Sequence, residues 1–95
     1  MPFCRHRCDY CAFATWTDRD HVAARYLEAC RVHAARLAPG LAPVTSVFVG
    51  GGTPSRVDPT PLLAVLAELP VAEGAEVTVE CNPDDLDAGR AAAFA

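Results

Sequence analysis

The sequence contains no lysine, and its 8 strongly basic residues are all arginine. Against 12 acidic residues they leave a formal net charge of −4. The arginines form no basic stripe, so we expect no nucleic-acid partner. Apolar runs are only a few residues long, far short of the roughly 20 residues that a membrane span needs. The N-terminus also lacks a charged region followed by an apolar one, so we expect no secretory signal and a cytoplasmic location.

The cysteine content argues against a disulfide scaffold. There are 5 cysteines, an odd number, and three of them lie within residues 4–11. Disulfide frameworks of secreted domains use even counts spread along the chain. Clustered cysteines without a secretory signal are typical of metal binding in a reducing cytosol.

The length and composition suggest part of a larger domain. The 95 residues are 52% hydrophobic, enough for a packed core and too much for a disordered chain. The sequence starts directly before its first motif and stops in a segment that we expect to be the beginning of a helix. We therefore expect residues 1–95 to be a fragment that is incomplete at both ends.

The hydrophobic pattern alternates between the periods of helix and strand. Strands alternating with helices predict parallel βαβ units and an α/β fold class, with chemistry gathered where strands end. We expect a helix from Thr17 or Asp18 to about Leu37, a strand over 44–49, a helix from Asp58 to near Pro70, a strand over 76–81 and a further helix starting within 84–87.

The three clustered cysteines, Cys4, Cys8 and Cys11, have the spacing C-x3-C-x2-C. A purely structural four-iron cluster takes four thiolates, so three ligands leave one iron free for a substrate. S-adenosylmethionine (SAM) can chelate that iron through its amino and carboxylate groups. Electron transfer into its sulfonium would then break a carbon–sulfur bond and give a 5′-deoxyadenosyl radical. The spacing predicts a [4Fe–4S] cluster and SAM as cofactors.

The competing interpretation of the cysteines is a zinc-stabilised binding module. His6 or His21 would supply the fourth ligand. Structural zinc more often takes two separated pairs of ligands, such as C-x2-C with a second pair further on. The observed spacing fits that arrangement poorly, so we favour the iron–sulfur cluster.

Two further motifs follow the predicted strands. Gly50, Gly51, Gly52 and Thr53 come directly after the first, where glycines let backbone approach a ligand closely. A tight turn is the alternative, and the dinucleotide fingerprint G-x-G-x-x-G is not matched. Glu80 ends the second strand, where its carboxylate could accept hydrogen bonds from an amine or ribose; the alternative is an ordinary outward-facing residue.

The two cysteines outside the motif need no role in metal binding. Cys30 lies on the apolar face of the first predicted helix, and Cys81 shares a strand face with Val77 and Val79. We expect both thiols to be buried as small core residues.

Three segments in series resemble the HemN/HemW group of radical SAM proteins. They are P-F-C-x3-C-x2-C, V-F-V-G-G-G-T-P-S and V-T-V-E-C-N-P, in that order. The group contains oxygen-independent coproporphyrinogen III dehydrogenase and the heme chaperone HemW. The resemblance implies that residues 1–95 are the N-terminal part of a radical SAM core domain, a partial (β/α) barrel with parallel strands.

The resemblance also implies roles for individual residues. The three cysteines would bind the cluster, and Tyr10 occupies an aromatic position that contacts SAM. Gly51, Gly52 and Thr53 would line the SAM site, and Glu80 matches a SAM-binding glutamate. The group usually has a tyrosine a few residues before the first cysteine, in a first strand that this sequence lacks.

The residues after Cys11 separate the two branches of the group. The dehydrogenase typically continues the motif as C-x3-C-x2-C-x-C, whereas here Ala12 and Phe13 follow. C-D-Y-C-A-F is more similar to the C-x-Y-C-D-F of the HemW branch, with Ala12 in place of the acidic residue. We favour a heme chaperone, with heme, client proteins and an electron donor as partners. The alternative is an enzyme that decarboxylates the propionates of a porphyrinogen.

Overall fold

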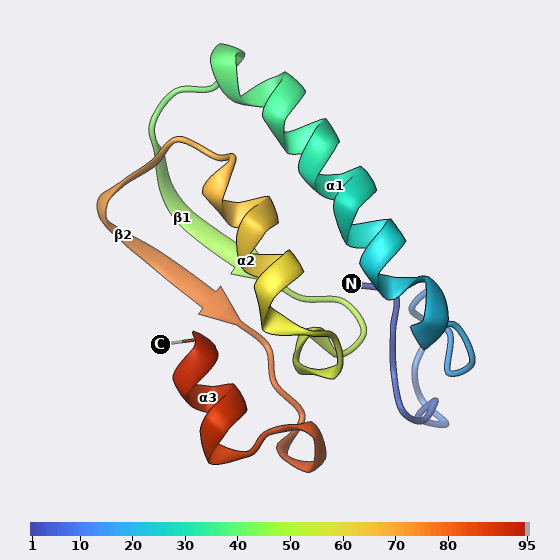
Figure 1. The fold of residues 1–95 in the computed structure, drawn as a ribbon. Helices are drawn as coiled ribbons and strands as arrows, with labels where there is room; N and C mark the ends of the chain where they lie inside the picture. Colours follow the sequence, from blue (N-terminus) through green and yellow to red (C-terminus); the bar gives the residue numbers. More distant parts are fainter. Residues whose placement is uncertain (95) are drawn as a thin grey trace.

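The computed structural model describes residues 1–94, which form a parallel two-stranded sheet with helices packed on it. The α/β class and the parallel strands agree with the sequence-based prediction. Figure 1 shows α1 and α2 side by side in front of the sheet and α3 beyond the end of β2. The elements are α1 (Ala23–Leu37), β1 (Val44–Val49), α2 (Pro59–Ala67), β2 (Val71–Val79) and α3 (Ala88–Phe94).

Helix α1 begins later than predicted. A 3₁₀ turn over Asp20–Val22 precedes it, and no side chain caps either element. The predicted caps, Thr17 and Asp18, are therefore wrong. A 3₁₀ turn tightens the first turn of a helix and satisfies part of its free amides, which makes a side-chain cap unnecessary.

Helix α2 begins as predicted. Asp58 precedes it in an extended conformation, and its carboxylate accepts a hydrogen bond of 2.9 Å from the Thr60 amide. Pro59 takes the first helical position, where its missing amide hydrogen is no loss. The helix ends at Ala67, three residues before Pro70.

Strand β2 is longer at its start than predicted and shorter at its end. Val71 pairs with Val44, and after an irregularity the regular ladder runs from the Ser46–Glu76 pair to the Val49–Val79 pair. Gly74, with φ of 76°, lies in the irregular part. The alternating pattern revealed only the regular ladder. Because the strand ends at Val79, Cys81 lies beyond it and is exposed, so its predicted burial is wrong.

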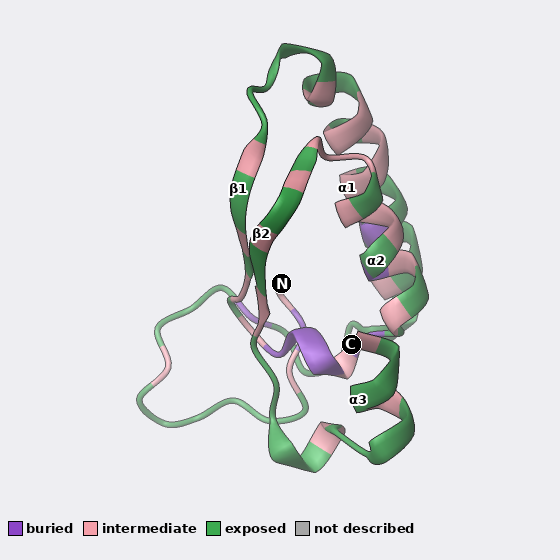
Figure 2. Ribbon diagram, turned by 90° about the vertical axis from the view of Figure 1, so that its left-hand side faces the viewer, coloured by how far each residue is buried: buried purple, intermediate pink, exposed green. Residues whose placement is uncertain are grey.

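The helices cover one face of the sheet, as Figure 2 shows, and the other face is largely exposed. Phe48 near the end of β1 is 66% exposed. The core is small because only one layer of helices contributes to it. It consists of Phe3, Leu27, Val57 and Leu62.

Only some of the leucines of the two longer helices are buried. Leu27 and Leu62 belong to the core, whereas Leu37 is 53% exposed and Leu63 is 39% exposed. Helix α2 has 9 residues and α1 has 15, so α2 cannot cover the whole of α1. Cys30 is half-buried rather than enclosed in the core.

Candidate functional site

The cysteine motif lies on a loop whose two ends are joined through the backbone. Phe3 and Trp16 form an isolated parallel bridge. The Cys4 amide donates to the Trp16 carbonyl at 3.1 Å, and the Trp16 amide donates to the Pro2 carbonyl at 2.9 Å. Residues 4–15 therefore form a closed loop, which we call the cysteine loop. Its base is fixed because Phe3 is buried and packs edge-on against Tyr26, with ring centroids 5.4 Å apart.

The segment before the cysteine loop runs along the glycine triplet. The Gly52 amide donates to the Met1 carbonyl, and the Thr53 amide donates to the Phe3 carbonyl at 2.7 Å. These bonds bring Cys4 beside the end of β1. The Thr53 hydroxyl oxygen lies 3.6 Å from the Cys4 sulfur, within reach of a weak hydrogen bond. The first and second motifs, about 50 residues apart in the sequence, thus meet in space.

The glycines are required by this close approach. A Cβ at Gly52 would lie 2.7 Å from the Phe3 carbonyl oxygen and 3.0 Å from the Cys4 sulfur. Gly51 has φ of 110°, a conformation that side-chain-bearing residues rarely adopt. The triplet therefore makes room for the cysteine segment. From the sequence, these glycines indicated close approach of a ligand or a tight turn, and their role in packing against the cysteine segment was not predicted.

Glu80 lies at the rim of the glycine triplet. Its Oε2 accepts a hydrogen bond of 3.2 Å from the Gly51 amide. A Cβ at Gly50 would lie only 2.8 Å from the same oxygen. The third motif therefore joins the second directly, because β1 and β2 are parallel and their carboxyl ends lie at one edge of the sheet.

Residues from all three motifs line one cavity of about 610 Å³. Its lining comes from the cysteine loop, which lies at the lower right of Figure 1, and from the segments that follow β1 and β2. Five further residues line it as well: Arg5, His6, Arg7, Cys81 and Asn82. Of these, the sequence had indicated a role in binding for His6 alone, as a zinc ligand. All eight predicted site residues are among its lining residues: Cys4, Cys8, Tyr10, Cys11, Gly51, Gly52, Thr53 and Glu80.

The three cysteines of the loop are free thiols. Cys4 and Cys11 are half-buried, and Cys8 is exposed. Within residues 1–94, no three side chains of His, Cys, Asp or Glu converge so as to hold a single metal ion. In a four-iron cluster each thiolate binds a different iron, so its ligands need not converge on one point. Three free thiols around one cavity are compatible with a cluster that each would bind at a separate iron. Of the two histidines considered as a fourth zinc ligand, His6 lines the cavity and His21 does not.

Tyr10 lies at the open side of the cavity and is 91% exposed. The pKa of its hydroxyl is raised, first because it hydrogen-bonds to Cys8 and then because the thiolate charge opposes its ionisation.

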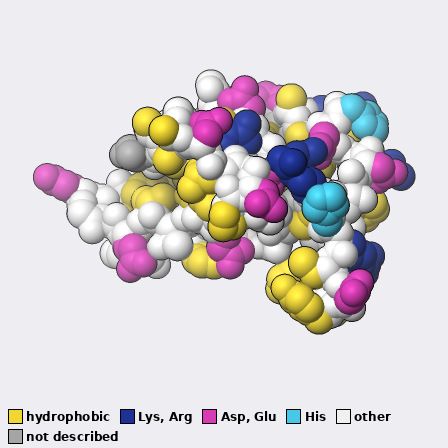
Figure 3. Space-filling model, turned by 90° about the horizontal axis from the view of Figure 1, so that it is seen from below, with side chains coloured by type: hydrophobic (Ala, Val, Ile, Leu, Met, Phe, Trp, Pro, Cys, Tyr) yellow, Lys and Arg dark blue, Asp and Glu magenta, His cyan; other side chains and the backbone are white. Residues whose placement is uncertain are grey.

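Charged side chains at the lower end of the molecule form a network that sequence analysis missed. Figure 3 shows arginine and histidine side chains among aspartates and glutamates on this face. Asp85 accepts hydrogen bonds from Arg5 at 2.7 Å and 3.1 Å, and Arg56 lies 3.5 Å from the same oxygen. The sequence could not reveal this network, because Arg5 and Asp85 are 80 positions apart. The one hint was the position of Arg5 directly after Cys4.

The buried Ser55 fixes the loop after β2. Its hydroxyl accepts a hydrogen bond of 2.9 Å from the Asn82 amide, and its carbonyl accepts one from Arg90 of α3. Ser55 is 0% exposed. The segment from Glu80 to α3 is thereby held against the loop that follows the glycine triplet.

Comparison with known proteins agrees with the motifs. The family model for the radical SAM superfamily matches residues 1–95. "Radical S-adenosyl methionine domain-containing protein 1, mitochondrial" from Bos taurus is 39% identical over 98% of this chain and 22% of its own length. "Heme chaperone HemW" from Synechocystis is 39% identical over 92% of this chain and 24% of its own length. "Oxygen-independent coproporphyrinogen III oxidase" from Paracoccus denitrificans is 36% identical over 100% of this chain and 23% of its own length.

The chain belongs to the radical SAM superfamily. It spans less than a quarter of the length of these three relatives, between 22% and 24%. No solved structure matches it significantly. Among the described residues, no helix has the length and apolar character to cross a membrane.

Proposed function

We propose that the protein binds a [4Fe–4S] cluster and SAM in the cysteine-lined cavity and acts as a cytoplasmic heme chaperone of the HemW branch. The observation that carries the proposal is the meeting of three motifs around one cavity. They come from the cysteine loop, the end of β1 and the end of β2. Parallel α/β folds bind ligands at this edge of the sheet.

The donor set supports this assignment of cofactors. Cys4, Cys8 and Cys11 would hold the cluster, and the iron without a protein ligand would be free for SAM. When bound, such a cluster supplies the electron that cleaves the sulfonium of SAM. Glu80, held by the Gly51 amide, offers a carboxylate to an amine or hydroxyl group of SAM.

The relatives support either branch of the group. Both a "Heme chaperone HemW" and an "Oxygen-independent coproporphyrinogen III oxidase" align over more than nine-tenths of the chain. The residues after Cys11 favour the chaperone, since Ala12 and Phe13 provide no further thiol. A chaperone would transfer heme to client proteins. In the alternative enzyme, an electron donor would reduce the cluster, the 5′-deoxyadenosyl radical from SAM would abstract a hydrogen atom from a porphyrinogen propionate, and the substrate radical would lose carbon dioxide and one electron to an acceptor.

Anaerobic reconstitution of the full-length protein tests the cofactors. We expect four irons per protein and a change in the electron paramagnetic resonance (EPR) spectrum of the reduced cluster when SAM is added. Replacing any cysteine of the loop by serine should abolish cluster binding, whereas Cys30→Ser, outside the cavity, should leave it intact. Bound zinc without iron or sulfide would contradict the proposal and support the zinc-stabilised module.

Heme titration and a turnover assay with coproporphyrinogen III separate the two branches. A chaperone should bind heme and leave the porphyrinogen unchanged. Sustained release of carbon dioxide from the porphyrinogen would assign the protein to the oxidase branch, while the assignment of cluster and SAM would stand.

A further inference from the structure

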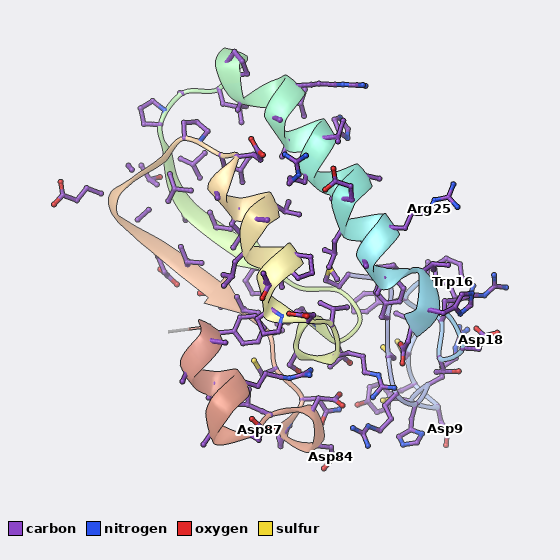
Figure 4. The ribbon with its side chains drawn as sticks, in the orientation of Figure 1. Asp9, Trp16, Asp18, Arg25, Asp84 and Asp87 are labelled. Carbon is purple, nitrogen blue, oxygen red and sulfur yellow. The ribbon has the colours of Figure 1, made fainter. Side chains whose placement is uncertain are left out.

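An ion pair joins the cysteine loop to the loop after β2. Arg5, directly after Cys4, donates to Asp85 Oδ1 through Nε at 3.1 Å and Nη2 at 2.7 Å. It also reaches the backbone carbonyl of Asp84 at 3.4 Å. Figure 4 shows Asp84, labelled before α3, at the same end of the molecule as Asp9, labelled on the cysteine loop. The pair thus joins two segments that both line the cavity.

The buried carboxylate of Asp85 depends on its few cationic partners. Its side chain is only 2% exposed, whereas that of Arg5 is 44% exposed. A buried carboxylate is stable only when cations and hydrogen-bond donors compensate it. Within residues 1–94, Arg5 and Arg56 do so, both through Oδ1, and Oδ2 has no partner. Removing Arg5 would leave Asp85 with the longer contact to Arg56 alone.

Arg56 extends the network to the start of α1. Its guanidinium pairs with Asp20 in the 3₁₀ turn that precedes the helix. Arg56 therefore connects Asp85 to the turn before α1, and Asp85 in turn binds Arg5. By contrast, Arg7 of the same loop makes no ion pair within the described residues. The cysteine loop is anchored at the residue next to Cys4 and not at its middle.

We propose that Asp85 is a positioning residue, which acts through Arg5 to hold Cys4 and the cysteine loop against the strand ends. This inference rests on the proposed function, because the position of the loop matters only if its thiols bind a cofactor. Partners that orient metal ligands from outside the ligand set typically change metal affinity by about 10–100-fold when they are mutated.

The test uses Asp85→Asn, Arg5→Gln and the double variant in the reconstituted full-length protein. Each single variant should lose its cluster to a chelator about 10-fold faster than the unmodified protein. The EPR response to SAM should be reduced, because the thiolates no longer hold the cluster facing Glu80. The double variant should lose its cluster no faster than the more affected single variant, since each single variant already removes the charged contact between Arg5 and Asp85. Asp84→Asn is the matched control, because its exposed side chain makes no such contact.

Several outcomes would overturn the inference. The first is that both single variants retain the cluster as well as the unmodified protein does. The second is that the increases in the rate of cluster loss add up in the double variant. The third is that Asp84→Asn loses the cluster as fast as Asp85→Asn. A lowered thermal midpoint with an unchanged EPR response to SAM would also overturn it, because Asp85 would then serve stability alone. If the unmodified protein itself binds no cluster, the proposed function fails together with this inference. If the unmodified protein binds the cluster and the variants behave like it, only this inference fails.

Discussion

At the scale of single residues, the cavity depends on a few atoms in close contact. The Glu80 carboxylate caps the Gly51 amide, and Gly52 allows the Cys4 sulfur to approach the end of β1. Neither contact involves a hydrophobic side chain. Substitutions at these positions should therefore affect ligand binding, either directly at Glu80 or, at Gly52, by shifting the segment around Cys4.

Glu80→Gln tests the carboxylate. The amide keeps the shape of the side chain but removes its charge, and a hydrogen bond to a charged group contributes about 1.5–3 kcal/mol. We expect the dissociation constant for SAM, measured by isothermal titration without oxygen, to rise by roughly 10-fold or more. Glu76→Gln is the control, because that side chain lies on β2, outside the cavity, and within residues 1–94 it accepts a hydrogen bond from the Thr78 hydroxyl alone. Equal affinities in the two variants would contradict a SAM contact at Glu80.

Gly52→Ala tests the close approach of the cysteine segment. Its Cβ would lie 2.7 Å and 2.9 Å from two backbone oxygens, which cannot move without shifting the segment around Cys4. Such overpacking typically costs about 1–3 kcal/mol. We expect a lower midpoint of urea unfolding together with weaker cluster retention. Gly40→Ala is the control, since a Cβ there meets nothing within 4 Å. A Gly52→Ala protein with wild-type stability would show that the segment is not tightly held.

At the scale of elements, the helices depend on their ends and on one shared interface. Helix α2 starts with the Asp58 cap, and Arg31 on α1 pairs with both Glu28 and Glu68. The Glu68 contact connects the end of α2 to α1. The helical layer is therefore fixed by local polar contacts as well as by the core.

Asp58→Ala removes the cap of α2. The Thr60 amide then loses its acceptor, which typically costs about 1 kcal/mol of stability. We expect urea unfolding of the full-length protein to show a loss of this size. Asp58→Asn, which keeps a side-chain oxygen, should remain close to the unmodified protein. A similar loss in both variants would mean that the charge of Asp58, rather than the cap, matters.

At the scale of the whole molecule, the described residues leave much apolar surface uncovered. The sheet has two strands, and Phe48 and Val77 on it are 66% and 50% exposed. The cysteine loop adds Tyr10 and Phe13, which are 91% and 63% exposed. Unpaired strand edges beside apolar surface favour association with other chains.

The isolated segment 1–95 should therefore aggregate or unfold without cooperativity. The core that the structure describes within residues 1–94 contains four buried hydrophobic side chains, too few to offset the entropy of ordering the chain. Size-exclusion chromatography and a thermal scan of the purified segment would test this. A monomer with a single sharp transition would contradict the prediction.

Much of the architecture could be predicted because it follows from local patterns. The strand over 44–49 and the start of α2 after Asp58 were predicted correctly, since β-branched runs and capping signals act within a few residues. The start of α1 and the early part of β2 were not. A 3₁₀ turn and an irregular strand pairing depend on neighbours that are distant in the sequence.

The sequence by itself determined the donor groups that the candidate site offers, since the types and spacing of Cys4, Cys8 and Cys11 need no coordinates to be recognised. Only the tertiary structure decided which groups surround them. It brought Glu80 to the Gly51 amide, gave the glycines a packing role and buried Asp85 beside Arg5. These contacts join residues that are about 30–80 positions apart, and no local pattern encodes pairs at such separations.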